Sequence, residues 1–311
     1  MQNERENQLN TVNDGLNSKT GGFTYSLAVA FYFALMLVVS IFLIATKLDT
    51  ESDAYIYINY LIAPVAISLC ILTVFKLRKL SFKSVFPVKC SPKYYLIAVL
   101  LIYGLLFSLS WVDSAAVEFF KLFGYKPRES SSYFPSLSGG RVVAAMIVIA
   151  VIPAVMEEAL FRGVILNSVE KSAGSIRTIF IVGFCFSLFH ASPEQTVYQF
   201  LAGCTFAFLA IRSGSILPSA VMHFLNNALL VIFGACNLYD EAGNLIVSEG
   251  ANIALIVTSA LCLVGGLVWL ILDKKPLIKC SKGGVKSFFL YGAMGIGVLS
   301  LVWVLSLFGV S

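Results

Sequence analysis

One apolar stretch that also carries charge decides the fold: RVVAAMIVIAVIPAVMEEALFRGVILNSV, residues 141–169. A helix needs ~20 mostly apolar residues to cross a bilayer, because each residue adds ~1.5 Å. This stretch is long enough, yet it contains Glu157, Glu158 and Arg162. Ionisable side chains at membrane depth are costly, so they are usually paired or functional. The stretch therefore predicts a membrane helix and a site within it.

The composition of the whole chain points the same way. Of its 311 residues, 58% are hydrophobic and 13% are charged, whereas soluble domains have about 25% charged residues. A soluble enzyme and a disordered protein are thereby excluded, and a net charge of +5 is no basic footprint for nucleic acid. The seven cysteines form no CxxC pair, so we expect reduced, mostly buried thiols.

The fold class that follows is an all-α integral membrane protein, a polytopic bundle of eight or nine transmembrane helices around an intramembrane catalytic cavity. The nine candidate spans are about 25–46, 54–75, 94–112, 141–169, 175–191, 194–211, 215–235, 251–272 and 286–308. We divide the chain into a flexible polar cytosolic tail (1–24), N-terminal helices with an external loop (25–140), a catalytic helical core (141–235) and C-terminal helices (236–311).

Charged loops give the orientation of the bundle. The loops at 76–93 and 273–286 are rich in Lys and Arg, which favours the cytoplasmic side. The loops that carry Asp49, Glu51 and Asp53, and Asp240, Glu241 and Glu249, are expected outside. The N-terminus is then cytoplasmic, and a bacterial plasma membrane is the expected location. In the external connection, 113–140, the first part looks amphipathic and is expected to lie along the membrane interface.

The charged residues of the fourth span suggest two different roles. Glu158 and Arg162 are four residues apart, so they can neutralise each other on one helical face. As a purely structural clamp, this pair would only hold helices together. Glu157 projects about 100° away on the helix and has no charge partner there. A desolvated carboxylate of this kind suits proton transfer.

The only two histidines, His190 and His223, also lie in predicted spans. Phe186 precedes His190 by one helical turn, and Asn227 follows His223 by one turn. Counting residues from the cytoplasmic ends places Glu157 and the two histidines at depths of about 17–21 Å. Similar depths on three helices indicate one shared site.

These residue types suggest a peptidase site without a covalent nucleophile. A carboxylate with a histidine can activate water and pass its proton to a leaving amine. A second histidine with an asparagine can stabilise an oxyanion. Glu157, His190 and His223 could instead bind zinc, since two histidines and one carboxylate are a known zinc set.

The three motifs EExxxR (Glu157, Glu158, Arg162), FxxxH (Phe186, His190) and HxxxN (His223, Asn227) occur in this order on successive apolar segments. Over about residues 140–232 the chain resembles the CPBP family of intramembrane CAAX proteases and bacteriocin-processing proteins, also called the Abi family. The resemblance implies a glutamate-type, metal-independent peptidase without a cofactor. It implies that Glu157 activates water with His190 as partner, and that His223 and Asn227 stabilise the oxyanion. Glu158, Arg162 and Phe186 would support the site.

The expected partners are the lipid bilayer and a peptide or membrane-protein substrate, with or without a lipid modification. Two alternatives stay open at this point. One is a zinc-dependent form of the same peptidase, and the other is a non-catalytic immunity or scaffold protein that binds a partner through the same cavity.

Overall fold

The computed structural model describes residues 15–127, 135, 137, 139–239, 245–280 and 285–309. These residues are helical throughout, apart from connections and one isolated bridge between Tyr239 and Leu245. The elements are α2 (Ser18–Thr46), α3 (Asp53–Arg78), α4 (Phe82–Val85), α5 (Lys93–Ser108), α6 (Trp111–Lys121), a continuous helix Arg141–Ala173, α10 (Ser175–Phe189), α11 (Thr196–Ser213), α12 (Leu217–Ala235), α13 (Glu249–Leu272) and α14 (Lys286–Leu307).

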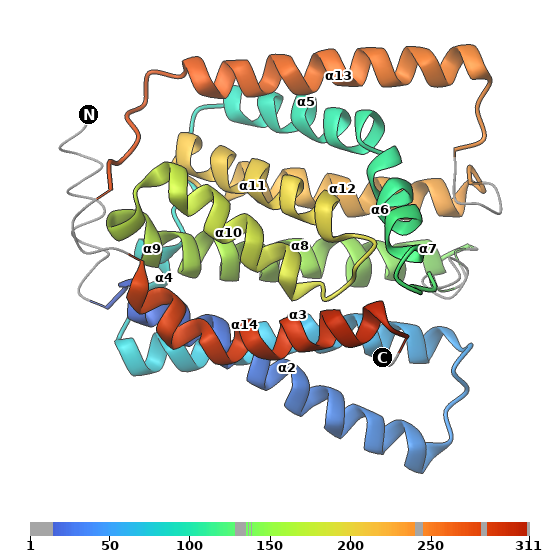
Figure 1. The fold of residues 1–311 in the computed structure, drawn as a ribbon, viewed down its shortest axis with the longest axis horizontal. Helices are drawn as coiled ribbons and strands as arrows, with labels where there is room; N and C mark the ends of the chain where they lie inside the picture. The colour runs from blue at the N-terminus through green and yellow to red at the C-terminus, as the bar shows by residue number, and fades with distance from the viewer. Residues whose placement is uncertain are drawn as a thin grey trace.

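The helices form three layers (Figure 1). The continuous helix lies in the middle layer with α10, α11 and α12. The helices α5 and α13 pack as a pair on one side of it, and α2, α3 and α14 lie on the other side. The middle layer is thereby shielded on both faces, and it contains every residue of the predicted motifs.

Membrane-spanning length distinguishes the helices. Six of those described are long and apolar enough to cross a membrane: α2, α3, Arg141–Ala173, α12, α13 and α14. A seventh is added if α5 and α6, bent by 41° at their junction, count as one span. Our expectation of eight or nine spans was therefore too high. The helix α10 has 15 residues, about 22 Å, and α11 includes Gln199 and Arg212 among its 18.

The N-terminal boundary also differs from expectation. We expected a polar tail to Thr24, but α2 begins at Ser18, where the side chain of Asn17 accepts a hydrogen bond from the backbone of Thr20. Residues 1–14 lie outside the described residues. The first turns of α2 are buried because Gly21 and Gly22 let α14 and Ser168 approach closely. Small and polar residues thus form a helix contact in a segment that, from its low hydropathy, we expected to belong to the tail.

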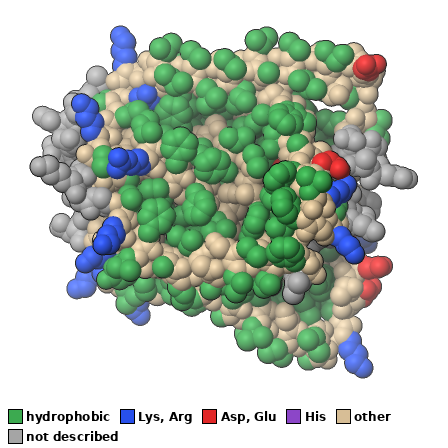
Figure 2. Space-filling view, viewed as in Figure 1, with side chains coloured by type: hydrophobic (Ala, Val, Ile, Leu, Met, Phe, Trp, Pro, Cys, Tyr) green, Lys and Arg blue, Asp and Glu red, His purple; other side chains and the backbone are tan. Residues whose placement is uncertain are grey.

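The two ends of the bundle differ in charge and packing. One end carries Lys76, Arg78, Lys79, Lys83, Lys89, Lys274, Lys275 and Lys279, and the other carries Asp49, Glu51, Asp53, Glu118, Glu194 and Glu249. In the space-filling view, many Lys and Arg lie at one edge, whereas the Asp and Glu in view lie at the opposite edge together with a few further Lys and Arg (Figure 2). We refer to these as the basic end and the acidic end. Apolar side chains cover the face between them, as a lipid-facing surface requires.

Candidate active site

The helix Arg141–Ala173 changes its winding on both sides of the two glutamates. Its elements are α7 (Arg141–Ala145), the π-helical η2 (Met146–Val151), α8 (Ile152–Glu158), the π-helical η3 (Ala159–Ile165) and α9 (Leu166–Ala173). Wide π turns are rare and are often found at functional sites. Here they bracket α8, so Glu157 and Glu158 sit at the end of a short, regularly wound segment between two widened ones.

Glu158 and Arg162 form the ion pair that their spacing predicted. An Arg162 guanidinium nitrogen donates to Glu158 Oε1 over 2.7 Å, and both side chains are fully buried. Another guanidinium nitrogen donates to the Gly203 carbonyl of α11 over 3.0 Å. The guanidinium also lies against the rings of Phe186 and Phe206, which is a favourable cation–π arrangement. Arg162 thereby ties three helices together.

His223 connects the two glutamates. Its Nδ1 lies 3.2 Å from Glu158 Oε1, and its Nε2 lies 3.9 Å from Glu157 Oε2. A carboxylate only accepts hydrogen bonds, so a bond at Nδ1 requires the proton there. Nε2 is then an acceptor in neutral His223 and a donor only in the imidazolium. Glu158 thus fixes which chemistry the cavity-facing nitrogen of His223 can perform.

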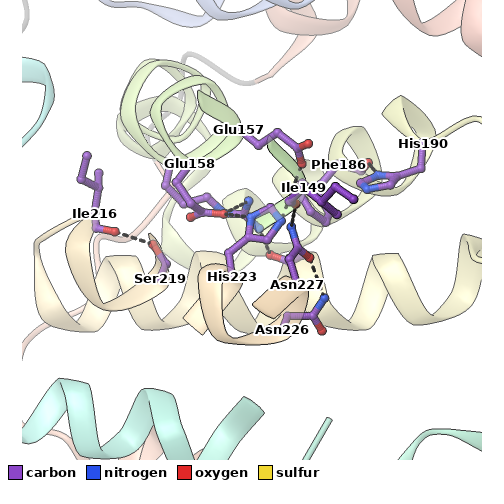
Figure 3. A network of polar contacts seen from close by, with 12 residues as sticks. Ile149, Glu157, Glu158, Phe186, His190, Ile216, Ser219, His223, Asn226 and Asn227 are labelled. Atoms are coloured by element: carbon purple, nitrogen blue, oxygen red, sulfur yellow. Dashed lines mark hydrogen bonds and ion pairs between the residues drawn. The ribbon is translucent and has the colours of Figure 1, made fainter. Parts of the chain in front are cut away.

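Glu157 is the least satisfied member of this set. It is 9% exposed, and its Oε2 is buried without a hydrogen-bond partner. With neutral His223, the four groups Glu157, Glu158, Arg162 and His223 carry one net negative charge. The carboxyl groups of the two glutamates diverge, with Glu158 turned toward His223 (Figure 3).

His190 approaches the site from another helix end. It directly follows α10, and its Nδ1 lies 2.9 Å from the Phe186 carbonyl. Its ring also makes an edge contact with the Phe186 ring, with centroids 4.8 Å apart. Phe186 contacts Arg162 and His223 as well. The ring of Phe186 therefore lies between the buried Glu158–Arg162 pair and His190.

Asn227 is held by a chain of hydrogen bonds that the sequence analysis did not identify. Tyr198 donates to Asn226 Oδ1 over 3.1 Å, Asn226 donates to Asn227 Oδ1 over 3.0 Å, and Asn227 donates to the Ile149 carbonyl over 3.2 Å. The chain fixes the orientation of the Asn227 amide. Adjacent asparagines on an apolar helix were the signal, because two half-buried amides need hydrogen-bond partners.

A cavity of about 280 Å³ joins these groups. Glu157, His190, His223 and Asn227 all line it, so the four predicted catalytic residues share one space. Its other lining residues include Tyr32, Asn59, Tyr60, Pro153, Tyr198, Gln199, Ala202, Phe206 and Asn226. The lining combines apolar walls with a few converging polar groups, which is typical of binding sites for small ligands and peptide segments.

The zinc alternative needs three converging ligands. Within the ranges described, no group of three or more His, Cys, Asp and Glu side chains is placed to hold a metal ion. Glu157 and His223 approach each other, but His190 directs Nδ1 at a backbone carbonyl. The side chains as they lie do not fit a zinc set.

Residues 139–229 match the family model described as "Type II CAAX prenyl endopeptidase Rce1-like". No curated protein and no solved structure matches the chain. Residues 139–229 are thus an Rce1-like domain of the CAAX protease family, within an all-α protein that has several candidate membrane spans. The match covers the three motifs and their helices, up to residue 229 within α12, and it agrees with the resemblance seen in the sequence.

Proposed function

We propose that the Rce1-like domain is the catalytic core of an intramembrane endopeptidase, in which Glu157 activates water to hydrolyse a peptide bond. One observation carries the proposal: Glu157 lines the cavity beside His223, with 3.9 Å between Glu157 Oε2 and His223 Nε2, and this oxygen has no hydrogen-bond partner. Family membership supports it, since Rce1-like proteins are described as endopeptidases.

The first step is attack of water on the substrate carbonyl carbon. Glu157 takes one proton from the water as its oxygen bonds to that carbon. Nε2 of imidazolium His223 and the amide of Asn227 donate hydrogen bonds to the oxyanion that forms. In the second step the C–N bond breaks, and protonated Glu157 returns its proton to the leaving amine. His190, on the same cavity, would assist this transfer.

The remaining residues orient these groups. Glu158 holds the proton on His223 Nδ1, and Arg162 offsets the charge of Glu158. Tyr198 and Asn226 fix the amide of Asn227. The route uses no metal ion, so activity is expected to persist in protein treated with a strong chelator. Inactivation by the chelator, with recovery on addition of zinc, would support the zinc-dependent alternative instead.

The decisive comparison uses cells that produce the wild type or Glu157→Gln at equal levels in the membrane. Mass spectrometry of released and membrane-bound peptides is expected to reveal products that need Glu157. The replacement keeps the size of the side chain and removes its basicity. Identical peptide profiles would reject the peptidase function. If the Glu157→Gln protein then also replaced the wild type in cells that lack it, the domain would be a non-catalytic scaffold.

A further inference from the structure

The position of the cavity along the bundle carries information about its substrate. We infer that the cavity is reached from the non-cytoplasmic side of the membrane, and that the substrate is a peptide segment presented at that face. The inference about the substrate rests on the proposed peptidase function, whereas the direction of access does not.

Charge defines the two sides. Short loops rich in Lys and Arg remain in the cytoplasm. The basic end includes the connections between α3 and α5 and between α13 and α14. These connections meet in space, since Lys93 pairs with Asp273 over 2.6 Å. The basic end is therefore the cytoplasmic end, and the acidic end faces the other compartment (Figures 1 and 2).

The middle layer is closed below the site, toward the basic end. Every residue from Leu160 to Leu166 is buried, including Arg162 with its ion pair. On α11 every residue from Thr205 to Ser213 except Phe208 is buried as well. Beneath them, Arg212 donates hydrogen bonds to the backbone of Ile271 and Lys275. Close packing of this kind leaves no space for water or peptide.

The cavity lies instead among helix turns near the acidic end. Tyr198 and Gln199 are in the first turn of α11, Asn59 and Tyr60 are in the second turn of α3, and His190 directly follows α10. None of the residues in 53–61 or 196–201 is buried. Helix α2 also has no buried residue after Val29, and its C-terminal half diverges from the bundle (Figure 1). The polar lining therefore leads away from the cytoplasm.

This placement selects among peptide substrates. A segment that is exported, or the outer part of a membrane protein, can reach Glu157 without crossing the packed layer. A lipid-modified C-terminus in the cytoplasm meets the side that Arg162, Phe161 and Leu160 close. A substrate bond near the outer face of the bilayer is thus the expected target.

Thiol labelling tests the direction of access without any need for turnover. The background variant replaces Cys90, Cys204, Cys236, Cys262 and Cys280 with serine and keeps the buried Cys70 and Cys185. Three proteins are then compared: one restores Cys236 at the acidic end, one restores Cys280 at the basic end, and one carries Gln199→Cys in the cavity. The probe is a membrane-impermeant maleimide, added to intact cells and to permeabilised cells.

We expect Cys236 and Gln199→Cys to react in intact cells, and Cys280 to react only after permeabilisation. The inference would be overturned if Gln199→Cys reacted only in permeabilised cells, as Cys280 is expected to do, or if it reacted in neither intact nor permeabilised cells. The same holds if Cys236 reacts only after permeabilisation. If the serine background fails to insert, an alanine background gives the same three reporters. The labelling pattern does not depend on catalysis. If the Glu157→Gln comparison rejects the peptidase function, the direction of access is still tested, so a failure of one proposal can be told from a failure of the other.

Discussion

The two ends of the bundle are built from the same apolar helices, but one end is closely packed and the other contains the cavity. From Glu158 toward the basic end, the Glu158–Arg162 pair is fully buried, and small residues such as Gly22 allow helices to touch. From Glu157 toward the acidic end, Glu157, His190 and Asn227 line a cavity, and none of the residues in the helix turns 53–61 and 196–201 is buried. The comparison teaches that buried charge is used for cohesion in one half and is kept available for chemistry in the other.

The largest expected effect comes from the open half. Glu157→Gln is expected to lower the rate of peptide hydrolysis by roughly 10²–10⁴-fold, the usual contribution of a general base. Its thermal unfolding in detergent should stay close to that of the wild type, because Glu157 Oε2 has no hydrogen bond to lose. Cleavage is measured by mass spectrometry of product peptides. A marked fall in unfolding temperature would show that Glu157 is structural.

The packed half should respond in the opposite way. Glu158→Gln removes the carboxylate that forms the ion pair with buried Arg162, which is expected to destabilise the protein by about 3–5 kcal/mol. Glu118→Gln is the matched control, since Glu118 forms an exposed ion pair with Lys121 and should change stability by less than about 1 kcal/mol. Thermal unfolding in detergent reads both. Equal stability of the two variants would contradict the cohesive role of the buried pair.

Helix contact in the packed half gives a smaller effect. A Cβ at Gly22 would collide with the Phe288 carbonyl of α14, a backbone atom that cannot move aside. Gly22→Ala is therefore expected to destabilise the protein by about 1–3 kcal/mol. Gly265→Ala is the control, because a Cβ at this position of α13 meets open space; it should be neutral or stabilising. Similar unfolding temperatures for the two would argue against close α2–α14 contact.

The hydrogen-bond chain to Asn227 should affect catalysis more weakly than Glu157 does. Asn226→Ala removes the donor to Asn227 Oδ1 and is expected to lower the maximal rate by about tenfold, which corresponds to about 1.4 kcal/mol. Substrate affinity should change less than the maximal rate, because an oriented oxyanion donor acts mainly in the transition state. Asn226→Gln keeps an amide donor and is expected to restore part of the lost rate. A change confined to affinity would indicate that Asn226 binds substrate instead.

The smallest effect concerns Asp273, outside the membrane segments at the basic end. Burial would raise the pKa of its carboxyl, but hydrogen bonds from Lys93, Lys275 and Tyr94 outweigh it and hold the pKa below its usual value. The stability from this group is therefore present above the unfolded pKa and is lost as pH falls through the folded one. Lys93→Met should weaken this acid dependence by less than about 1 kcal/mol. The same loss of stability on acidification in the wild type and in Lys93→Met would contradict this role of the Lys93–Asp273 pair.

Much of the site was predictable because its signals are local. The Glu158–Arg162 pair follows from one helical turn, and it was confirmed at 2.7 Å. The contact of Phe186 with His190 follows from the same spacing. The hydrogen bond from His223 to Glu158 was not predicted, since the two residues are on different helices. The role of Asn226 was also missed, because its partner Tyr198 lies on α11.

The sequence by itself determined the membrane class and the motif residues on their helices, and it predicted the orientation from charged loops. These properties depend on composition and on spacing within one helix. Only the tertiary structure decided that α2 begins inside the polar segment and that α10 and α11 fall short of full spans. It also decided that His223 lies between two glutamates. Packing between distant segments sets these features, and no local pattern encodes which faces will meet.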